Sequence, residues 1–336
     1  MSNVYAGGQG EEALKGGRRG ISGSTVKLVG IVTMFIDHLA AAVLFRVIFR
    51  ILMTDGRTDR FYDLYSIYSA MRTVGRLGFP IFCFLLVEGF DKTRSRAKYA
   101  LRLGIFALIS EIPFDLAFKA KVLEFGYQNV YFTLFFGMLA LCAYDFLQKH
   151  KLPTVMRWLM CVAGVVIPGA WLTRFSWQYV QRYVLQYISI SIEEKIAAAV
   201  VFLGICILIV VLLLLYGRRM GTDKALTVGT NLVVLFLLMW LADLLHTDYS
   251  GMGVLTITVI YVFRRYKVLA MAGGCIVLTM MSLNEVSAFL TLIPIAKYNG
   301  KRGLKLKYFF YAFYPVHLLL LWLVTWFMGT SSIPVF

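Results

Sequence analysis

The sequence predicts an all-α protein, a polytopic transmembrane helical bundle of about 10 to 11 spans, and three observations support this class. Hydrophobic residues make up 60% of the 336 residues and charged residues only 15%. The mean hydropathy of +0.74 is far above that of a soluble domain. The chain also divides into long apolar runs separated by short basic loops, the pattern of a chain that crosses a bilayer repeatedly.

Eleven apolar runs are the candidate spans, and three of them are short for a hydrocarbon core about 30 Å thick. The runs cover residues 26–49, 74–89, 99–118, 129–147, 156–172, 196–216, 226–245, 251–263, 268–282, 286–296 and 308–328. Residues 1–24 are Gly-rich and polar, so we expect them to form a disordered cytoplasmic tail. Residues 25–330 are then expected to form a single transmembrane domain.

The charges in the loops predict a topology. With the N-terminus inside, the loops after the second, fourth, sixth, eighth and tenth runs are cytoplasmic, and each is strongly basic. The outer loops at 50–72 and 173–195 carry mixed charges, so the alternation follows the positive-inside rule. We therefore expect a multi-pass protein of the plasma (inner) membrane with a cytoplasmic N-terminus and an outer C-terminus. If the short tenth run is not a span, the C-terminus would lie on the other side of the membrane. The net charge of +16 resides in these loops, which argues against a nucleic-acid partner.

The first run carries an ionisable pair, Asp37 and His38, deep inside it. Counting about 1.5 Å per residue from Lys27, His38 lies roughly 16 Å along the helix, near the middle of the hydrocarbon core. A charged side chain there costs about 2.5 to 3.5 kcal/mol even on the lenient insertion scale, so such residues usually mark a site. The alternative is that both are polar contacts between helices without a chemical role.

The third run carries two carboxylates, Glu111 and Asp115, four residues apart and hence on one helix face. Their mutual repulsion favours a polar cavity, and Arg76 at the outer end of the second run is a candidate counter-ion. The alternative for Arg76 is a side chain that extends to the interface. In the last run, His317 again lies near the midplane, and the two histidines would meet if the bundle closes on itself.

His38 cannot pair ideally with its neighbour Asp37, because adjacent helical residues point about 100° apart. Its candidate partners are therefore Glu111, Asp115 and His317 from other runs. A histidine oriented in this way suits a general base or a nucleophile, and it equally suits a proton relay in a transporter. We find no phosphate-binding loop, no His-Glu-x-x-His motif and no nucleophile elbow, and we expect no metal.

Short motifs spread over both ends of the chain resemble the TraX family. They are GSTVKL (23–28), MFIDH (34–38), GRLGFPIF (75–82), VEGF (87–90), TRSRAKY (93–99), LRL (101–103), SEIPFD (110–115), QNV (128–130), TDYSGMG (247–253) and YPVHL (314–318). The namesake is a membrane protein that acetylates the N-terminus of conjugative pilin. Against the family core, residues 152–216 look like an insertion.

The TraX family is similar in turn to wider transmembrane acyltransferases, which pass acetyl groups from cytoplasmic acetyl-CoA to acceptors across or within the membrane. In the sugar-acetylating members, ten residues separate an arginine from a functional histidine, and Lys27 and His38 have the same spacing here. The resemblance implies a transmembrane acyltransferase-like fold with acetyl-CoA as co-substrate. It implies partners that are acyl-CoA, membrane lipids and an unknown acceptor, which is a peptide N-terminus, a glycan or a small amine.

The resemblance also implies roles for individual residues. His38 would be the general base or a transient acyl carrier, with Asp37, Glu111 and Asp115 orienting the site. The residues expected to bind acetyl-CoA or the acceptor are Lys27, Arg76, Glu88, Arg94, Arg102, Asn129, Asp248, Tyr314 and His317. The alternative for the loop cations is topology alone. A proton-coupled transporter and a non-catalytic assembly factor of an envelope apparatus remain the competing functions.

Overall fold

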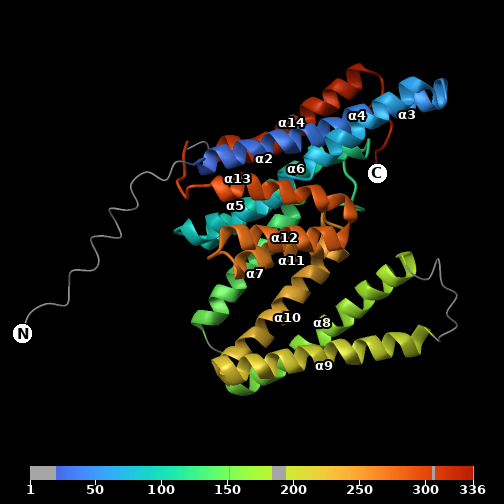
Figure 1. Ribbon diagram of the computed structural model, residues 1–336. Helices are drawn as coiled ribbons and strands as arrows, with labels where there is room; N and C mark the ends of the chain where they lie inside the picture. The colour runs from blue at the N-terminus through green and yellow to red at the C-terminus, as the bar shows by residue number, and fades with distance from the viewer. Residues whose placement is uncertain (1–19, 151, 184–193, 305–306, 336) are drawn as a thin grey trace, which may run out of the picture. The chain divides into compact units, whose positions relative to one another are not determined.

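The computed structural model describes residues 20–150, 152–183, 194–304 and 307–335, and within these ranges the chain forms helices and no β-strand (Figure 1). The predicted all-α class is thereby confirmed. Most of the predicted N-terminal tail, residues 1–19, lies outside the described residues. The prediction of a single domain over 25–330, with an insertion at 152–216, stays a prediction.

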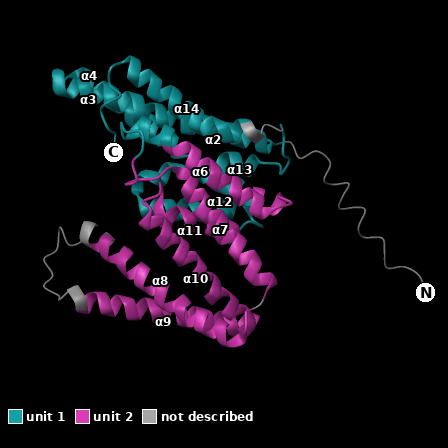
Figure 2. Ribbon diagram, turned by 180° about the vertical axis from the view of Figure 1, so that it is seen from behind, with its two compact units in different colours: residues 1–88, 112–123, 262–336 teal, residues 89–111, 124–261 magenta. Residues whose placement is uncertain are grey.

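The chain forms two compact units, coloured separately in Figure 2. The first unit contains residues 1–88, 112–123 and 262–336, and the second contains residues 89–111 and 124–261. Three of the four boundaries fall inside helices, namely α5 (Gly78–Lys92), α6 (Arg96–Phe118) and α11 (Ser250–Val262), and the fourth lies between residues 123 and 124, after the end of α6.

The first unit begins with one long helical rod made of α2 (Gly23–His38), a π-helix (Leu39–Leu44) and α3 (Phe45–Thr54). At 1.5 Å per residue this rod of 32 residues is about 48 Å long, so it exceeds a hydrocarbon core of about 30 Å. The chain then returns through α4 (Asp59–Gly75) and α5. The expectation of an outer loop over 50–72 is therefore wrong for most of its length. Helix α4 contains many polar residues, so a search for apolar runs did not detect it.

Helix α5 starts two residues before Pro80, which places the proline in the first turn of the helix. A first-turn N–H has no partner within its own helix, so proline costs no helical hydrogen bond there. The break between α4 and α5 at residues 76–77 gives Arg76 its position at the end of α4, where it is the C-cap residue.

The remainder of the first unit is α12 (Lys267–Met281), a 3-10 helix (Leu283–Thr291), α13 (Leu292–Lys297) and α14 (Lys307–Phe327). The expected tenth span, residues 286–296, is divided between the 3-10 helix and the six residues of α13. Neither piece is long enough to cross a bilayer as an α-helix.

Helices α2 and α14 lie side by side and run in the same direction (Figure 1). The Nζ atom of Lys27 lies 5.2 Å from the ring centroid of Phe310, and His38 contacts His317 eleven and seven residues farther along the two helices. The start of α2 and the end of α14 are consequently at opposite ends of the first unit.

The second unit contains the first part of α6, then α7 (Val130–Lys149), α8 (Thr154–Tyr183), α9 (Glu194–Met220), α10 (Thr222–Leu244) and α11. Helix α10 packs against α7, α8 and α9, so it is the centre of this unit. Among the candidate spans, α9 contains the stretch of highest hydropathy, and that stretch of residues 196–220 has no buried side chain. Such a surface is expected where a helix faces lipid.

Seven helical stretches among the described residues are long and apolar enough to span a membrane, compared with the eleven runs found in the sequence. Helices α11 and α12 are too short, with 13 and 15 residues. Helix α6 has 23 residues but carries Arg102, Glu111 and Asp115 along its length. The apolar runs were located correctly, but an apolar run is not always a complete span.

Candidate active site around His38 and His317

His38 is the last residue of α2, at the point where the α-helix becomes a π-helix. Helix α2 begins at an N-cap, Ser22, whose side chain accepts a hydrogen bond from the Thr25 N–H at 3.3 Å. The π-helix that follows His38 contains the buried residues Ala40, Ala41 and Ala42, whose small side chains permit close packing of neighbouring residues. Single π-turns within α-helices are rare and occur frequently at functional sites.

The imidazole of His38 is paired with that of His317 from α14. Nδ1 of His38 lies 2.7 Å from Nε2 of His317, and the two rings are parallel within 2° with centroids 5.0 Å apart. Nδ1 of His317 lies 2.7 Å from the carbonyl oxygen of Phe313. The meeting of these two histidines, anticipated from their depth in the first and last runs, is confirmed.

The carbonyl of Phe313 fixes the protons of the pair. A carbonyl only accepts, so Nδ1 of His317 carries a hydrogen and donates it. Nε2 of a neutral His317 then has a lone pair and accepts from Nδ1–H of His38. A neutral His38 is left with its own lone pair on Nε2. These two hydrogen bonds therefore make Nε2 the basic nitrogen of His38.

Aromatic rings enclose the histidine pair. Phe118 and Tyr314 meet the His38 ring edge-on, with centroids 5.5 and 5.7 Å away. The ring of Phe313 stacks on His317 at 4.7 Å. His317 is only 2% exposed and His38 is partly exposed. Because the rings restrict both imidazoles, His38 is held in one orientation.

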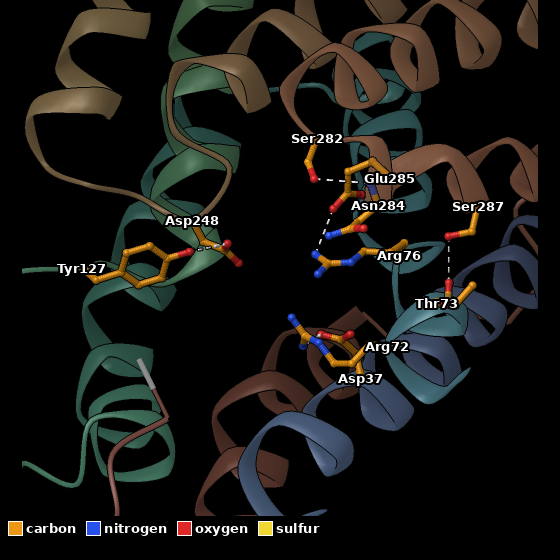
Figure 3. A network of polar contacts seen from close by, with 10 residues as sticks. All are labelled: Asp37, Arg72, Thr73, Arg76, Tyr127, Asp248, Ser282, Asn284, Glu285 and Ser287. Atoms are coloured by element: carbon orange, nitrogen blue, oxygen red, sulfur yellow. Dashed lines mark hydrogen bonds and ion pairs between the residues drawn. The ribbon is translucent and has the colours of Figure 1, made fainter. Parts of the chain in front are cut away.

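Asp37 forms an ion pair with Arg72 of α4, with Oδ2 and the guanidinium nitrogen 2.7 Å apart (Figure 3). Their side chains are 17% and 21% exposed, so the pair is largely withdrawn from solvent. The Asp37 carboxylate lies against Gly75, where a Cβ atom would clash with it. Sequence reasoning identified Asp37 but not Arg72, which it assigned to an outer loop.

Arg76 forms an ion pair with Glu285 of the 3-10 helix at 2.8 Å, and the Glu285 side chain is 1% exposed (Figure 3). Next to this pair, the hydroxyl of Ser287 donates to the backbone carbonyl of Thr73 at 2.9 Å. The expected role of Arg76 as a counter-ion to Glu111 and Asp115 stays a prediction, and Glu285 is a partner that the sequence did not suggest. The sequence did not reveal Glu285 because the 3-10 segment was taken for a span.

Glu111 and Asp115 both lie on α6 and are buried, as their spacing predicted. In the second unit, the side-chain amide of Asn129 donates to the Glu111 carboxylate and, at 2.8 Å, to the carbonyl of Ala107. Asn129 is also the N-cap of α7, because its side-chain oxygen accepts from the Tyr131 N–H at 3.0 Å. One asparagine therefore connects the start of α7 to the acidic turn of α6.

Asp248 lies in a loop of the second unit that has unusual backbone geometry. The hydroxyl of Tyr127 donates to its carboxylate at 2.8 Å (Figure 3). Three neighbouring non-glycine residues have positive φ, namely His246 at 49°, Tyr249 at 63° and Ser250 at 46°. Left-handed conformations are uncommon outside glycine and concentrate at functional or strained sites.

Lys27 and Glu88 lie at the other end of α2 from His38. Lys27 interacts electrostatically with Glu88 and Arg302, and the hydroxyl of Tyr298 donates to the Glu88 carboxylate. Burial, and secondly the bond to Glu88, raise the pKa of Tyr298 above that of an ordinary tyrosine. Of the other expected donor-binding residues, Arg94 is exposed and Arg102 lies 5.6 Å from the ring of Tyr99, both in the second unit.

Sequence reasoning missed a further buried cation, Arg46. Its guanidinium is completely buried and donates to the carbonyls of Ala42 and Ala117 at 2.6 Å and of Ile333 at 2.7 Å. A charged residue within an apolar run, eight positions after His38, was the available signal. Arg46 joins the first helical rod to the end of α6 and to the C-terminal segment.

Comparison of the sequence with known protein families gives one match. The family model described as TraX protein matches residues 22–235 and 205–325. The chain belongs to the TraX family. Both histidines of the pair lie within the regions that match the family model, since residue 38 falls in the first and residue 317 in the second. The resemblance first seen in short motifs is thereby confirmed.

A similar curated protein is the probable fimbrial assembly protein FimC, serogroup H1, of Dichelobacter nodosus. The two are 37% identical over 124 residues, which is 34% of the TraX chain and 43% of the relative. The similarity thus spans less than half of the relative's length. No solved structure matches the chain.

Proposed function

We propose that this TraX-family protein is an integral-membrane acyltransferase that moves an acetyl group from cytoplasmic acetyl-CoA to an amine or hydroxyl acceptor. The observation that carries the proposal is the hydrogen-bonded chain Phe313–His317–His38. It leaves a lone pair on Nε2 of a histidine deep in a membrane-spanning helix. An ionisable base at this depth of a membrane-spanning helix is costly to maintain, and proton abstraction would account for its presence.

The proposed reaction uses His38 as a general base. Nε2 of His38 takes the proton from the acceptor N–H or O–H while the acceptor atom attacks the thioester carbonyl. The C–S bond then breaks as the new C–N or C–O bond is completed. The leaving thiolate takes the proton from the imidazolium, so that free coenzyme A is released and His38 is regenerated. His317 supports the charge that develops on His38 through the shared hydrogen bond.

The position of Lys27 supports entry of the donor from the start of α2. Lys27 and His38 are eleven residues apart, so they lie within about 20° of one another around the helix and roughly 16 Å apart along it. A donor lying along this face would bring its phosphates to Lys27 and Arg302 and its thioester to His38. Arg94 and Arg102 remain proposed donor contacts.

The family and the relative support the choice of the first acceptor class to test. The TraX namesake acts on a pilin N-terminus, and the similar protein is named for fimbrial assembly. We therefore propose a peptide amine as the first acceptor to test, with a glycan or a small amine as alternatives. Arg76, Asn129, Tyr314 and Asp248 are the proposed acceptor contacts, and Asp37, Glu111 and Asp115 the proposed orienting acids.

The decisive experiment measures release of free thiol from acetyl-CoA by purified protein in detergent. His38→Ala should reduce turnover by about 10²- to 10⁴-fold, the usual contribution of a general base. His246→Asn is the matched control, because it removes an imidazole far along the chain and asparagine tolerates positive φ. Full turnover by folded His38→Ala protein would contradict the mechanism.

A non-catalytic assembly factor is the second candidate, and the name of the FimC relative favours it. The two functions are separated by complementation of a strain that lacks the protein. If His38→Ala protein restores assembly of surface fibres as well as wild type, the chain acts without catalysis. If only wild type restores assembly and thiol release, the acyltransferase is supported. Proton-dependent uptake into vesicles without thiol release would instead indicate transport.

A further inference from the structure

The second unit contains a pocket of about 440 Å³ where the start of α6 meets the end of α7. Its size is within the range of ordinary ligand sites. Its basic residues Arg96 and Lys149 are the terminal residues of these two helices, and Asp145 is its one carboxylate. Neither the proposed chemistry nor the family assignment requires this pocket.

The cations of the pocket are fixed in place by one carboxylate. Arg96 and Lys149 both form ion pairs with the same oxygen of Asp145, Lys149 at 2.8 Å. The guanidinium of Arg96 also lies 4.3 Å above the ring of Phe90. Two positive charges that share one negative charge leave a net positive site, and His150 adds a third nitrogen-bearing side chain to the lining. An anion is therefore the complementary ligand.

The part of the pocket lined by Ala100 and Leu139 is apolar. Ala100 lies one helical turn beyond Arg96, and Leu139 lies ten residues before Lys149, about 15 Å along α7. The pocket is thus cationic at the helix ends and apolar farther along the helices. A ligand that matches both parts has an anionic head and a hydrocarbon chain.

We propose that this pocket binds an anionic phospholipid, with its phosphate at Arg96 and Lys149 and an acyl chain along Ala100 and Leu139. The helix ends in question belong to loops predicted to lie at the cytoplasmic surface, where anionic headgroups are found. The phosphates of coenzyme A share the anionic chemistry but bring no hydrocarbon chain for the apolar part. The lipid is therefore the better match.

The test compares lipid retention by the full-length protein, measured by native mass spectrometry after reconstitution into phosphatidylglycerol or phosphatidylcholine nanodiscs. Wild type should retain phosphatidylglycerol in preference to phosphatidylcholine. Lys149→Ala should weaken that preference about fivefold, the loss expected for one basic residue at an anionic surface. Lys149 is 62% exposed, so its replacement should not affect folding. Lys98→Ala is the matched control on α6, because Lys98 does not line the pocket.

A second variant keeps every charge. Ala97 is an exposed wall residue, and Ala97→Trp should fill the pocket and abolish retention. Protection of Cys142, which also lines the pocket, from maleimide by phosphatidylglycerol would support the assignment, with Cys161 as the reference thiol. Three results would overturn it: equal retention of both lipids, equal effects of Lys98→Ala and Lys149→Ala, or displacement of the lipid by coenzyme A.

Discussion

Nε2 of His317, in the last helix, lies 2.7 Å from Nδ1 of His38, and the two imidazole rings are parallel within 2°. The contact joins residues 279 positions apart in the chain. It is the relationship on which the basicity of His38 Nε2 depends, because His317 is the acceptor that fixes the proton on Nδ1.

His317→Leu should lower thiol release from acetyl-CoA by about 10- to 100-fold, the usual cost of losing a group that orients a functional histidine. His317→Gln should restore part of the rate, because its carbonyl oxygen can accept from Nδ1–H of His38. Steady-state kinetics of both variants provide the measurement. A merely structural role would give equal rates for Leu and Gln, and the lost activity would then follow the loss of thermal stability.

Gly75→Ala should separate Asp37 from Arg72, because the new Cβ would occupy the space of the Asp37 carboxylate. Overpacking of this kind usually costs about 1 to 3 kcal/mol. The unfolding midpoint in detergent is the measurement. Gly204→Ala is the control, since that helical position has open space around it and alanine favours helix. Equal midpoints for Gly75→Ala and wild type would show that α4 approaches α2 less closely than described.

A double-mutant cycle of Asp37→Asn and Arg72→Gln should give a coupling energy of about 0.5 to 3 kcal/mol. The direct ion pair at 2.7 Å is the reason. The free energy of unfolding is measured for wild type, both single variants and the double variant. Arg57→Gln, in the exposed turn between α3 and α4, should be additive with Asp37→Asn. Additivity of the Asp37–Arg72 cycle would refute the ion pair.

Arg46→Gln should release the C-terminal segment, because it removes the guanidinium that bonds to Ile333 and Ala117. Hydrogen bonds to a charged group contribute about 1.5 to 3 kcal/mol each. Hydrogen exchange at the Val335 amide, which donates to the carbonyl of Phe118 at 2.7 Å, should become faster. Arg50→Gln is one turn farther along α3 and makes only a 3.5 Å contact with Met328, so it should change little. Unchanged exchange in Arg46→Gln would contradict the prediction.

The sequence was sufficient to find the membrane class and the depth of the two histidines, since both follow from hydropathy and from helical rise. It was insufficient for Arg72 and Glu285, because each reaches its partner from a segment that hydropathy misassigned. Helix α4 is too polar for hydropathy to identify it as a membrane span. The 3-10 helix is apolar enough that hydropathy does not reveal the interruption in the α-helical structure. The π-turn after His38 leaves no periodic signal, since three alanines fit an ordinary helix equally well.

The parallel packing of α2 and α14 has a consequence for biosynthesis. A ribosome makes His38 near the start of the chain and His317 near its end, so the pair cannot form until the final helix has been synthesised and inserted. The C-terminal residues that bond to Arg46 emerge later still. A truncated translation product would carry the first histidine without the acceptor that fixes the proton on its Nδ1.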